Sequence, residues 1–398
     1  MMLDKIKDYD YTLMITPLLL TGFGMVMVYS ASMVVAVVDG NESNHYLIRQ
    51  LIFFAISSIA FATCCLLPYQ VYQRLMKVII LSCIVLLISV LIFGSAANNA
   101  RSWFSIGPLS MQPAEFAKLG LIIYLAAIYS KKQSYLNEFK KGVLPPLVLT
   151  IILLGLIVLQ PDIGTAAIIF LMACSVIFAS GIKWKHLTIL VLIGISLVLF
   201  AAPNMITEER LSRFTGAYQP FESPDLNGYQ LIQSYVAIGV GGLTGEGLGQ
   251  SVQKLGFLDE AHTDFIMAVI AEELGFLGVV IVIGLLATIV IRGLYIAKKC
   301  KDSFGSLLAI GISSMVGIQT FINLGAISGI LPITGVPLPF VSYGGSSMLI
   351  MLISMGILNN IAKQVNQQEQ DREELAPKPA MQNQNSTNMY RGGKRWQS

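Results

Sequence analysis

The stretch that decides the fold reads Lys254-Leu255-Gly256-Phe257-Leu258-Asp259-Glu260-Ala261-His262-Thr263-Asp264-Phe265. An apolar run from Ile266 to Ile291 follows, and its only charged residues are Glu272 and Glu273. About twenty such residues suffice for a helix to cross a bilayer. The carboxylate of Asp264 therefore lies where a polar segment enters a membrane helix, and ionisable groups at such a depth are costly unless they have a function.

Two interpretations of Asp264 are open. In the first, Asp264 is the leading candidate for chemistry. In the second, Thr263 or Asp264 only caps the helix, because Ser, Thr and Asp side chains accept hydrogen bonds from N–H groups of the first turn. A capping box is absent, since neither Ile266 nor Met267 is Glu or Gln.

The composition predicts an all-α, polytopic membrane protein. Of 398 residues, 55% are hydrophobic and 12% charged, and the mean hydropathy is +0.69. We expect no nucleic-acid partner, and the five cysteines show neither a disulfide framework nor metal-ligand spacing. Apolar runs predict ten transmembrane helices, near residues 13–38, 46–67, 77–94, 113–130, 143–160, 162–181, 186–202, 264–291, 305–327 and 346–362.

The distribution of Lys and Arg sets the predicted orientation. With the N-terminus inside, most of the 26 basic residues fall in inner segments, including the tail from Lys363 onward. The positive-inside rule therefore predicts that both termini are cytoplasmic. Residues 1–363 form the ten-helix membrane domain, with a large extracellular loop, 203–263, between helices 7 and 8. Residues 364–398 are polar and are expected to form a disordered cytoplasmic tail.

Several other polar residues stand in or beside the predicted spans. Glu115 and Lys118, at i and i+3, suit an ion pair within the membrane. Asp162 after Pro161 suits a helix start. The adjacent Glu272 and Glu273 cannot both face lipid cheaply, so at least one should face a polar interior.

In the predicted topology, four even-numbered helices begin at the outer face. Their starts lie at Gln112-Pro113, at Gln160-Pro161-Asp162, at His262-Thr263-Asp264 and at Ser342-Tyr343-Gly344-Gly345-Ser346. Helix N-termini favour anions, so converging starts would make a site for phosphate. The Pro- and Gly-rich segment 329–340 would form a wall of such a cavity.

Taken together, these motifs resemble the SEDS family (shape, elongation, division and sporulation). The resemblance covers nearly the whole chain up to about Lys363. Within the family, the motif sequences most resemble those of the cell-division members. One departure is Asp259, where the family pattern usually has Pro. The matching stretches are Ala100-Arg101-Ser102-Trp103, Gln112-Pro113-Ala114-Glu115-Phe116-Ala117-Lys118, Gln160-Pro161-Asp162-Ile163-Gly164-Thr165, Ala261-His262-Thr263-Asp264-Phe265-Ile266, Glu272-Glu273-Leu274-Gly275 and Pro337-Leu338-Pro339-Phe340-Val341-Ser342-Tyr343-Gly344-Gly345-Ser346.

The resemblance implies a peptidoglycan glycosyltransferase that polymerises lipid II at the outer face of the bacterial cytoplasmic membrane, at the division septum. Its implied partners are lipid II, the glycan linked to undecaprenyl pyrophosphate, a class B penicillin-binding protein and other division proteins. The family's essential carboxylate falls on Asp264. The expected substrate-binding residues are Arg101, Trp103, Lys118, Glu115, Asp162, His262, Thr263, Glu272, Ser342, Gly344 and Gly345.

The chemistry expected is an inverting glycosyl transfer. Asp264 would act as general base toward the sugar 4-hydroxyl of lipid II, or would instead hold a divalent cation, Mg²⁺ or Mn²⁺. Three alternatives stay open: a lipid II flippase or transporter with the buried charges as a relay, an elongation or sporulation polymerase of the same family, and a scaffold that recruits division enzymes.

Overall fold

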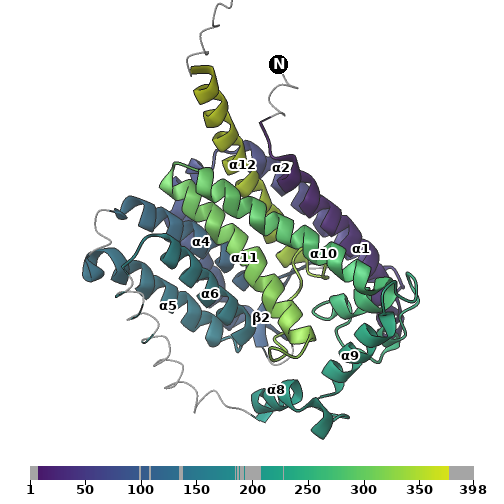
Figure 1. The fold of residues 1–398 in the computed structure, drawn as a ribbon. Coiled ribbons are helices and arrows are strands. Elements are labelled where there is room, and N and C mark those ends of the chain that lie inside the picture. The colour runs from purple at the N-terminus through teal and green to yellow at the C-terminus, as the bar shows by residue number, and fades with distance from the viewer. Residues whose placement is uncertain are drawn as a thin grey trace, which may run out of the picture.

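A computed structural model describes residues 8–97, 100–106, 109–133, 138–183, 185, 188, 192, 208–226 and 228–375. Most of the described chain is helical, as Figure 1 shows. The α-helices are α1 (Tyr11–Val38), α2 (His45–Leu66), α3 (Gln70–Phe93), α4 (Pro113–Lys131), α5 (Leu144–Val158), α6 (Ile163–Ala179), α8 (Glu208–Tyr218), α9 (Tyr229–Gly241), α10 (Ile266–Lys299), α11 (Ser303–Ile327) and α12 (Gly345–Leu375). Short turns η3 (Phe139–Val143), η4 (Pro220–Glu222) and η5 (Gln253–Leu255) join them.

Nine of the ten predicted spans coincide with helices. Among the described residues, eight helices are long and apolar enough to cross a membrane, and α6 is a shorter apolar helix. The predicted break between the fifth and sixth spans is present, because α5 ends at Val158 and Asp162 caps α6. The remaining predicted span, 186–202, lies outside the described residues except for Thr188 and Leu192.

A small antiparallel sheet between α3 and α4 corrects the all-α prediction. It consists of β1 (Ser95–Ala97), β2 (Ala100–Ile106) and β3 (Leu109–Met111), in that order. Aromatic and β-branched residues such as Trp103, Phe104 and Ile106 favour strands.

Small residues let the helices approach closely, as is usual where lipid surrounds a bundle. A Cβ atom on Gly293 of α10 would come 2.1 Å from Ser313 Oγ of α11. A Cβ atom on Gly311 of α11 would come 2.4 Å from a methyl carbon of Ile122 on α4. Helices α4, α11 and α12 are the most deeply buried of the long helices, and Figure 1 shows α5 toward one edge of the bundle.

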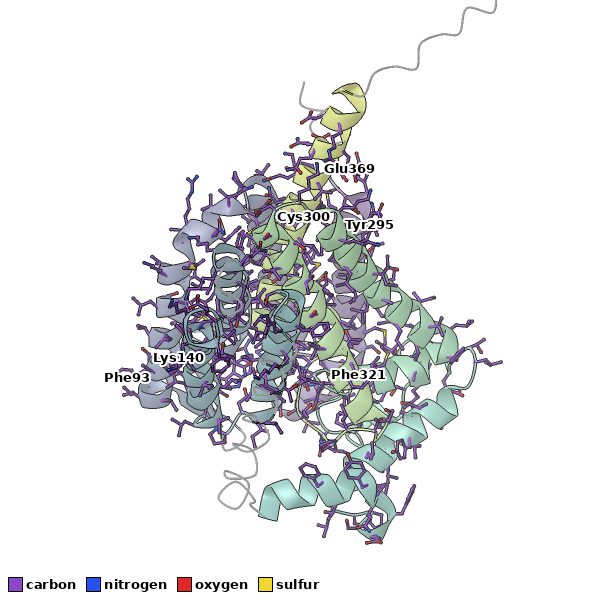
Figure 2. The ribbon with its side chains drawn as sticks, turned by 60° about the vertical axis from the view of Figure 1, so that its left-hand side comes forward. Phe93, Lys140, Tyr295, Cys300, Phe321 and Glu369 are labelled. Carbon is purple, nitrogen blue, oxygen red and sulfur yellow. The ribbon has the colours of Figure 1, made fainter. Side chains whose placement is uncertain are left out.

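The N-terminal segment and the end of α12 lie at the same end of the molecule. Lys363 Nζ is 3.2 Å from Tyr9 Oη, and Gln367 Nε2 donates to Asp8 Oδ2 at 2.7 Å. Figure 1 shows this part of α12 projecting past the bundle beside the N-terminus, with α8 and α9 at the opposite end. Figure 2 places Tyr295, Cys300 and Glu369 at the first end and Phe321 of α11 well away from it.

The prediction that the tail is disordered from residue 364 is wrong for residues 364–375. They continue α12, because Gln364 and Gln367 bond to Gln70 and to Asp8. Residues 376–398 lie outside the described part. The predicted loop 203–263 also contains regular structure, since α8, η4, α9 and η5 fall within it.

Candidate active site

The predicted convergence of helix starts is present, and Gln112 links three of them. Its backbone N–H donates to Ser346 Oγ of α12 at 3.1 Å, and its side-chain amide donates to Asp162 Oδ2 at 3.0 Å. The other oxygen of Asp162 caps α6 by accepting from Thr165 N at 3.0 Å, as expected for a helix start. The start of α10 joins the group through Tyr343 N, which donates to the His262 carbonyl at 2.9 Å.

Asp264 lies in a tight turn that ends where α10 begins. The N–H groups of Thr263 and Phe265 both donate to the Glu260 carbonyl, at 3.1 and 3.3 Å. Glu260 has a φ of 54°, which is uncommon for a residue other than glycine and is often found at functional sites. The Thr263 hydroxyl lies 2.7 Å from Glu260 Oε2 and 3.1 Å from Asp264 Oδ1.

The N-cap residue of α10 is Phe265, and not Thr263 or Asp264 as the capping interpretation required. Helix α10 starts at Ile266 and has no acidic residue in its first turn. Thr263 and Asp264 lie directly before the N-cap, and Asp264 is half-buried.

Two side-chain amides on α11 hold the site's backbone from within the bundle. The Asn323 amide nitrogen lies 2.7 Å from the carbonyl of Asp264 and 2.7 Å from that of Val336. One turn earlier, Gln319 Nε2 donates to the Pro337 carbonyl at 2.9 Å. The segment 329–344 has no helix or strand, so these bonds satisfy backbone groups that secondary structure leaves open.

Glu115 and Lys118 form the predicted ion pair. Their Oε1 and Nζ atoms are 2.7 Å apart, and both side chains are almost fully buried. Lys118 Nζ also donates to Gln319 Oε1 at 2.9 Å, which links the pair to the Pro337 carbonyl. The second carboxylate oxygen of Glu115 is buried and has no hydrogen-bond partner within the described residues. The pair thus supports, at Pro337, the wall formed by the Pro- and Gly-rich segment 329–340.

Ser342 and Gly345 shape that wall. Ser342 Oγ accepts from Leu338 N at 2.7 Å, and its N–H donates to the Leu338 carbonyl at 3.1 Å. Gly345 packs against the ring of Phe53, where a Cβ atom would come within 2.2 Å. Gly344 has room for a Cβ atom, so packing does not account for its identity.

The imidazole of His262 is buried beneath two tyrosines. Its ring centroid is 4.7 Å from that of Tyr46 and 5.6 Å from that of Tyr343. Burial lowers the pKa of His262, and the nearby carboxylates of Glu260 and Asp39 only partly oppose the shift. His262 Nδ1 is buried without a hydrogen-bond partner in the described ranges.

Glu272 and Glu273 face a polar interior, as predicted. The carboxylate of Glu272 accepts hydrogen bonds from residues 251–253 and not from the helix starts. One of its oxygens accepts from Val252 N at 2.8 Å, and the other accepts from the Ser251 hydroxyl. Glu273 Oε1 is 2.7 Å from Lys254 Nζ. Glu272 therefore contacts the segment before η5 and not the residues gathered around Gln112.

Helix α10 is broken directly after these two carboxylates. Gly275 has φ 66° and ψ −164°, and a Cβ atom there would come 2.4 Å from Gly245 N. The Glu272 and Glu273 carbonyls accept from Glu246 N and Gly247 N, at 2.9 and 3.0 Å. The Gly-rich patch 239–249 thus allows another backbone to bond to the broken helix.

Arg101 and Trp103 lie on β2 beside the helix starts. Trp103 is half-buried, and its carbonyl accepts from Ser95 Oγ at 3.0 Å. The side chain of Arg101 lies outside the described part. The sheet reaches the site through Ser346 Oγ, which donates to the Ser110 carbonyl at 3.3 Å.

The oxygen donors near Asp264 fit a divalent cation held jointly with substrate. Mg²⁺ is usually bound by one or two carboxylates, waters and substrate phosphates and not by an all-protein cage. The turn offers the carboxylates of Asp264 and Glu260 and the Thr263 hydroxyl between them. Over the described ranges, no group of three or more His, Cys, Asp and Glu residues could hold a metal by itself.

Sequence analysis missed three contributors to the site. Gln319 and Asn323 are spaced by four in an apolar helix, so one polar face of α11 could have been recognised. Gly24 of α1 gave no such signal, although a Cβ atom there would come 2.6 Å from the Val341 carbonyl.

The chain is similar in sequence to known proteins. The chain is 50% identical to the probable peptidoglycan glycosyltransferase FtsW of Bacillus subtilis, over 98% of this chain and 100% of that protein. It is 40% identical to stage V sporulation protein E of the same organism, over 91% of this chain and 99% of that protein.

Solved structures share the fold. A chain of a peptidoglycan synthase complex matches with a TM-score of 0.73 at 29% identity, covering 90% of this chain and 98% of that one. The rod shape determining protein RodA of Thermus thermophilus matches with a TM-score of 0.66 at 29% identity, covering 89% of this chain and 97% of that one. The model of the FtsW/RodA/SpoVE cell cycle protein family matches residues 11–367, and the chain belongs to this family.

Proposed function

We propose that this protein is a peptidoglycan glycosyltransferase that polymerises lipid II into glycan strands at the outer face of the cytoplasmic membrane. The observation that carries the proposal is the Asp264 turn, whose backbone is bonded to Asn323 of α11 and, through the His262 carbonyl, to Tyr343 N beside the start of α12. Family membership and the FtsW relatives point to the same activity.

In this mechanism Asp264 accepts the proton of the lipid II sugar 4-hydroxyl as that oxygen attacks the anomeric carbon of the growing glycan. A well-placed general base contributes roughly 10²–10⁴-fold. The bond between the anomeric carbon and the undecaprenyl pyrophosphate oxygen breaks, the anomeric configuration inverts, and undecaprenyl pyrophosphate leaves with the electron pair. If Asp264 instead holds Mg²⁺ or Mn²⁺, that ion would supply charge neutralisation for the leaving group.

The leaving pyrophosphate also needs positive charge from the protein. The starts of α4, α6, α10 and α12 supply N–H groups and the positive ends of helix dipoles. Arg101 is the proposed direct ligand, with Trp103, His262, Thr263, Ser342, Gly344 and Gly345 lining the cavity. Lys118 is bonded to Glu115 and to Gln319, and these residues act by supporting the wall. Asp162 is bonded to Gln112, and it acts by holding two helix starts together. Glu272 acts by holding residues 251–253.

The test is polymerisation of fluorescent lipid II by the purified protein, with and without its class B penicillin-binding protein, and analysis of glycan chain length. Glycan chains that depend on Asp264 are the expected result.

The same preparation in liposomes tests the flippase alternative: transfer of lipid II between leaflets without any glycan synthesis would overturn the proposal. We favour the enzyme over the transporter because the buried charges of Glu115–Lys118 and of Lys254–Glu273 neutralise each other within each pair. A transporter that moves charge along a relay needs charges that can be exchanged.

We further propose ten spans with both termini in the cytoplasm, and action at the division septum with other division proteins. The contacts of residues 8–9 with residues 363–367 support termini on one side. A single cysteine at Ser223 should react with an impermeant thiol reagent added outside intact cells, and one at Asn137 should not. The reverse labelling pattern would contradict the topology.

A further inference from the structure

Three side chains from distant parts of the sequence form a closed, buried triangle beside the break in α10. Lys254 Nζ lies 2.7 Å from Glu273 Oε1 and 2.8 Å from Ser30 Oγ. Ser30 Oγ lies 2.7 Å from the same Glu273 oxygen. The Lys254 and Glu273 side chains are 3% and 0% exposed, so the pair is fully withdrawn from solvent.

The triangle closes the segment that carries Asp264. Lys254 stands ten residues before Asp264 and Glu273 nine residues after it, so their ion pair joins the two ends of this segment. Glu272 reinforces the junction by accepting from the backbone N–H groups of Val252 and Gln253. The junction therefore holds together the two ends of the segment that carries the turn.

Ser30 connects the junction to the opposite wall through α1. The same helix carries Gly24, which contacts the backbone of Phe340 and Val341. Helix α1 thus contacts the Asp264 segment at one point and the Pro-rich wall at another.

A contribution to stability does not explain a buried ion pair well. Withdrawing each charge from water costs several kcal/mol, and replacing such a pair with apolar side chains is often neutral or stabilising. A role in selecting one arrangement of the surrounding backbone accounts for the triangle better.

We propose that Lys254, Glu273 and Ser30 are positioning residues for glycosyl transfer. They hold the Asp264 turn at a fixed place relative to residues 337–346. This inference rests on the proposed function of Asp264. Displacing a catalytic group by about 1 Å can cost on the order of 10²-fold in rate.

The test compares three variants of the protein in complex with its penicillin-binding partner. Lys254→Met/Glu273→Met removes both charges together and so leaves no unpaired buried charge. Ser30→Ala keeps the ion pair and removes only its tie to α1. Ser32→Ala is the matched control, because Ser32 is buried on the same helix and its hydroxyl has no hydrogen-bond partner among the described residues.

We expect the double variant to lose about 10- to 100-fold in kcat for fluorescent lipid II, with KM and the unfolding temperature near the parental values. Ser30→Ala should lose a smaller part of kcat, and Ser32→Ala none. A folded double variant with parental kcat would overturn the proposal. If the double variant does not fold, parental kcat in Ser30→Ala would overturn it. Activity surviving in Asp264→Asn would instead remove the proposed function itself, so the two failures are distinguishable.

Discussion

The side-chain amide of Asn323, a buried residue of α11, donates to the backbone carbonyl of Asp264 at 2.7 Å. The same nitrogen contacts the Val336 carbonyl at 2.7 Å. One buried amide thereby fixes the Asp264 turn and the Pro-rich wall with respect to each other. The position of the carboxylate is a property of α11 as much as of its own segment.

This relationship predicts the effect of Asn323→Leu. The substitution leaves two buried carbonyls without their donor, at about 1–3 kcal/mol for each unsatisfied group. We expect lipid II polymerisation to fall at least tenfold and thermal unfolding of the detergent-solubilised protein to occur at a lower temperature. Thr320→Val is the control, since the Thr320 hydroxyl only bonds back to the Val316 carbonyl of its own helix. Equal activity in the two variants would remove Asn323 from the site's support.

A second prediction uses two glycines of α1. A Cβ atom on Gly24 would come 2.6 Å from the Val341 carbonyl, whereas Gly22 has no atom within 4 Å of such a Cβ. Gly24→Ala should push residues 340–341 away and reduce polymerisation several-fold. Gly22→Ala should be neutral in activity, because it changes helix propensity in the same direction without a clash. Parental activity in Gly24→Ala would show that this wall can shift without consequence.

A third prediction concerns pH. Burial lowers the pKa of His262 below its ordinary value of about 6.5. The folded protein then binds fewer protons at this residue than the unfolded chain, so stability falls as the pH drops below about 6.5. His262→Phe keeps an aromatic ring against Tyr46 and removes this term. Between pH 8 and pH 5, the unfolding temperature of His262→Phe should decline less steeply at the acidic end than that of the parent. An identical dependence of the unfolding temperature on pH in the two proteins would contradict a lowered pKa of His262.

Sequence patterns predicted the spans well because an apolar run of sufficient length has few alternatives in a bilayer. They also placed four helix starts on one face, and the structure brings these starts together, as the bond between Gln112 and Asp162 shows. They could not reveal the break at Gly275 or the Lys254–Glu273 pair. Both depend on a backbone segment returning to α10 from outside the bundle, which no local periodicity encodes.

The strand segment shows a different limit. Residues 100–106 have the composition of a strand, but the all-α prediction rested on the long apolar runs, which say nothing about a short segment between two spans. For Asp264, sequence alone left a cap and a catalytic group as alternatives. The structure places the N-cap of α10 at Phe265, one residue after Asp264, and the catalytic role of Asp264 stays a prediction.

The last prediction concerns Asp264 itself. Asp264→Asn preserves the size of the side chain and an oxygen that can contact the Thr263 hydroxyl, but it removes the negative charge. Because α10 has no side-chain cap, the variant should insert, fold and bind its penicillin-binding protein as the parent does. Glycan synthesis should nevertheless fall by roughly 10²–10⁴-fold if the carboxylate takes the proton. Rates are compared at equal amounts of folded complex, with Asp259→Asn as the neighbouring control for loss of one negative charge, because Asp259 is exposed. A rate near the parental value in Asp264→Asn would end the catalytic assignment. Titrating Mg²⁺ and Mn²⁺ into chelator-treated parent then separates the two chemical roles, since a residue that only accepts a proton gives no reason for dependence on metal.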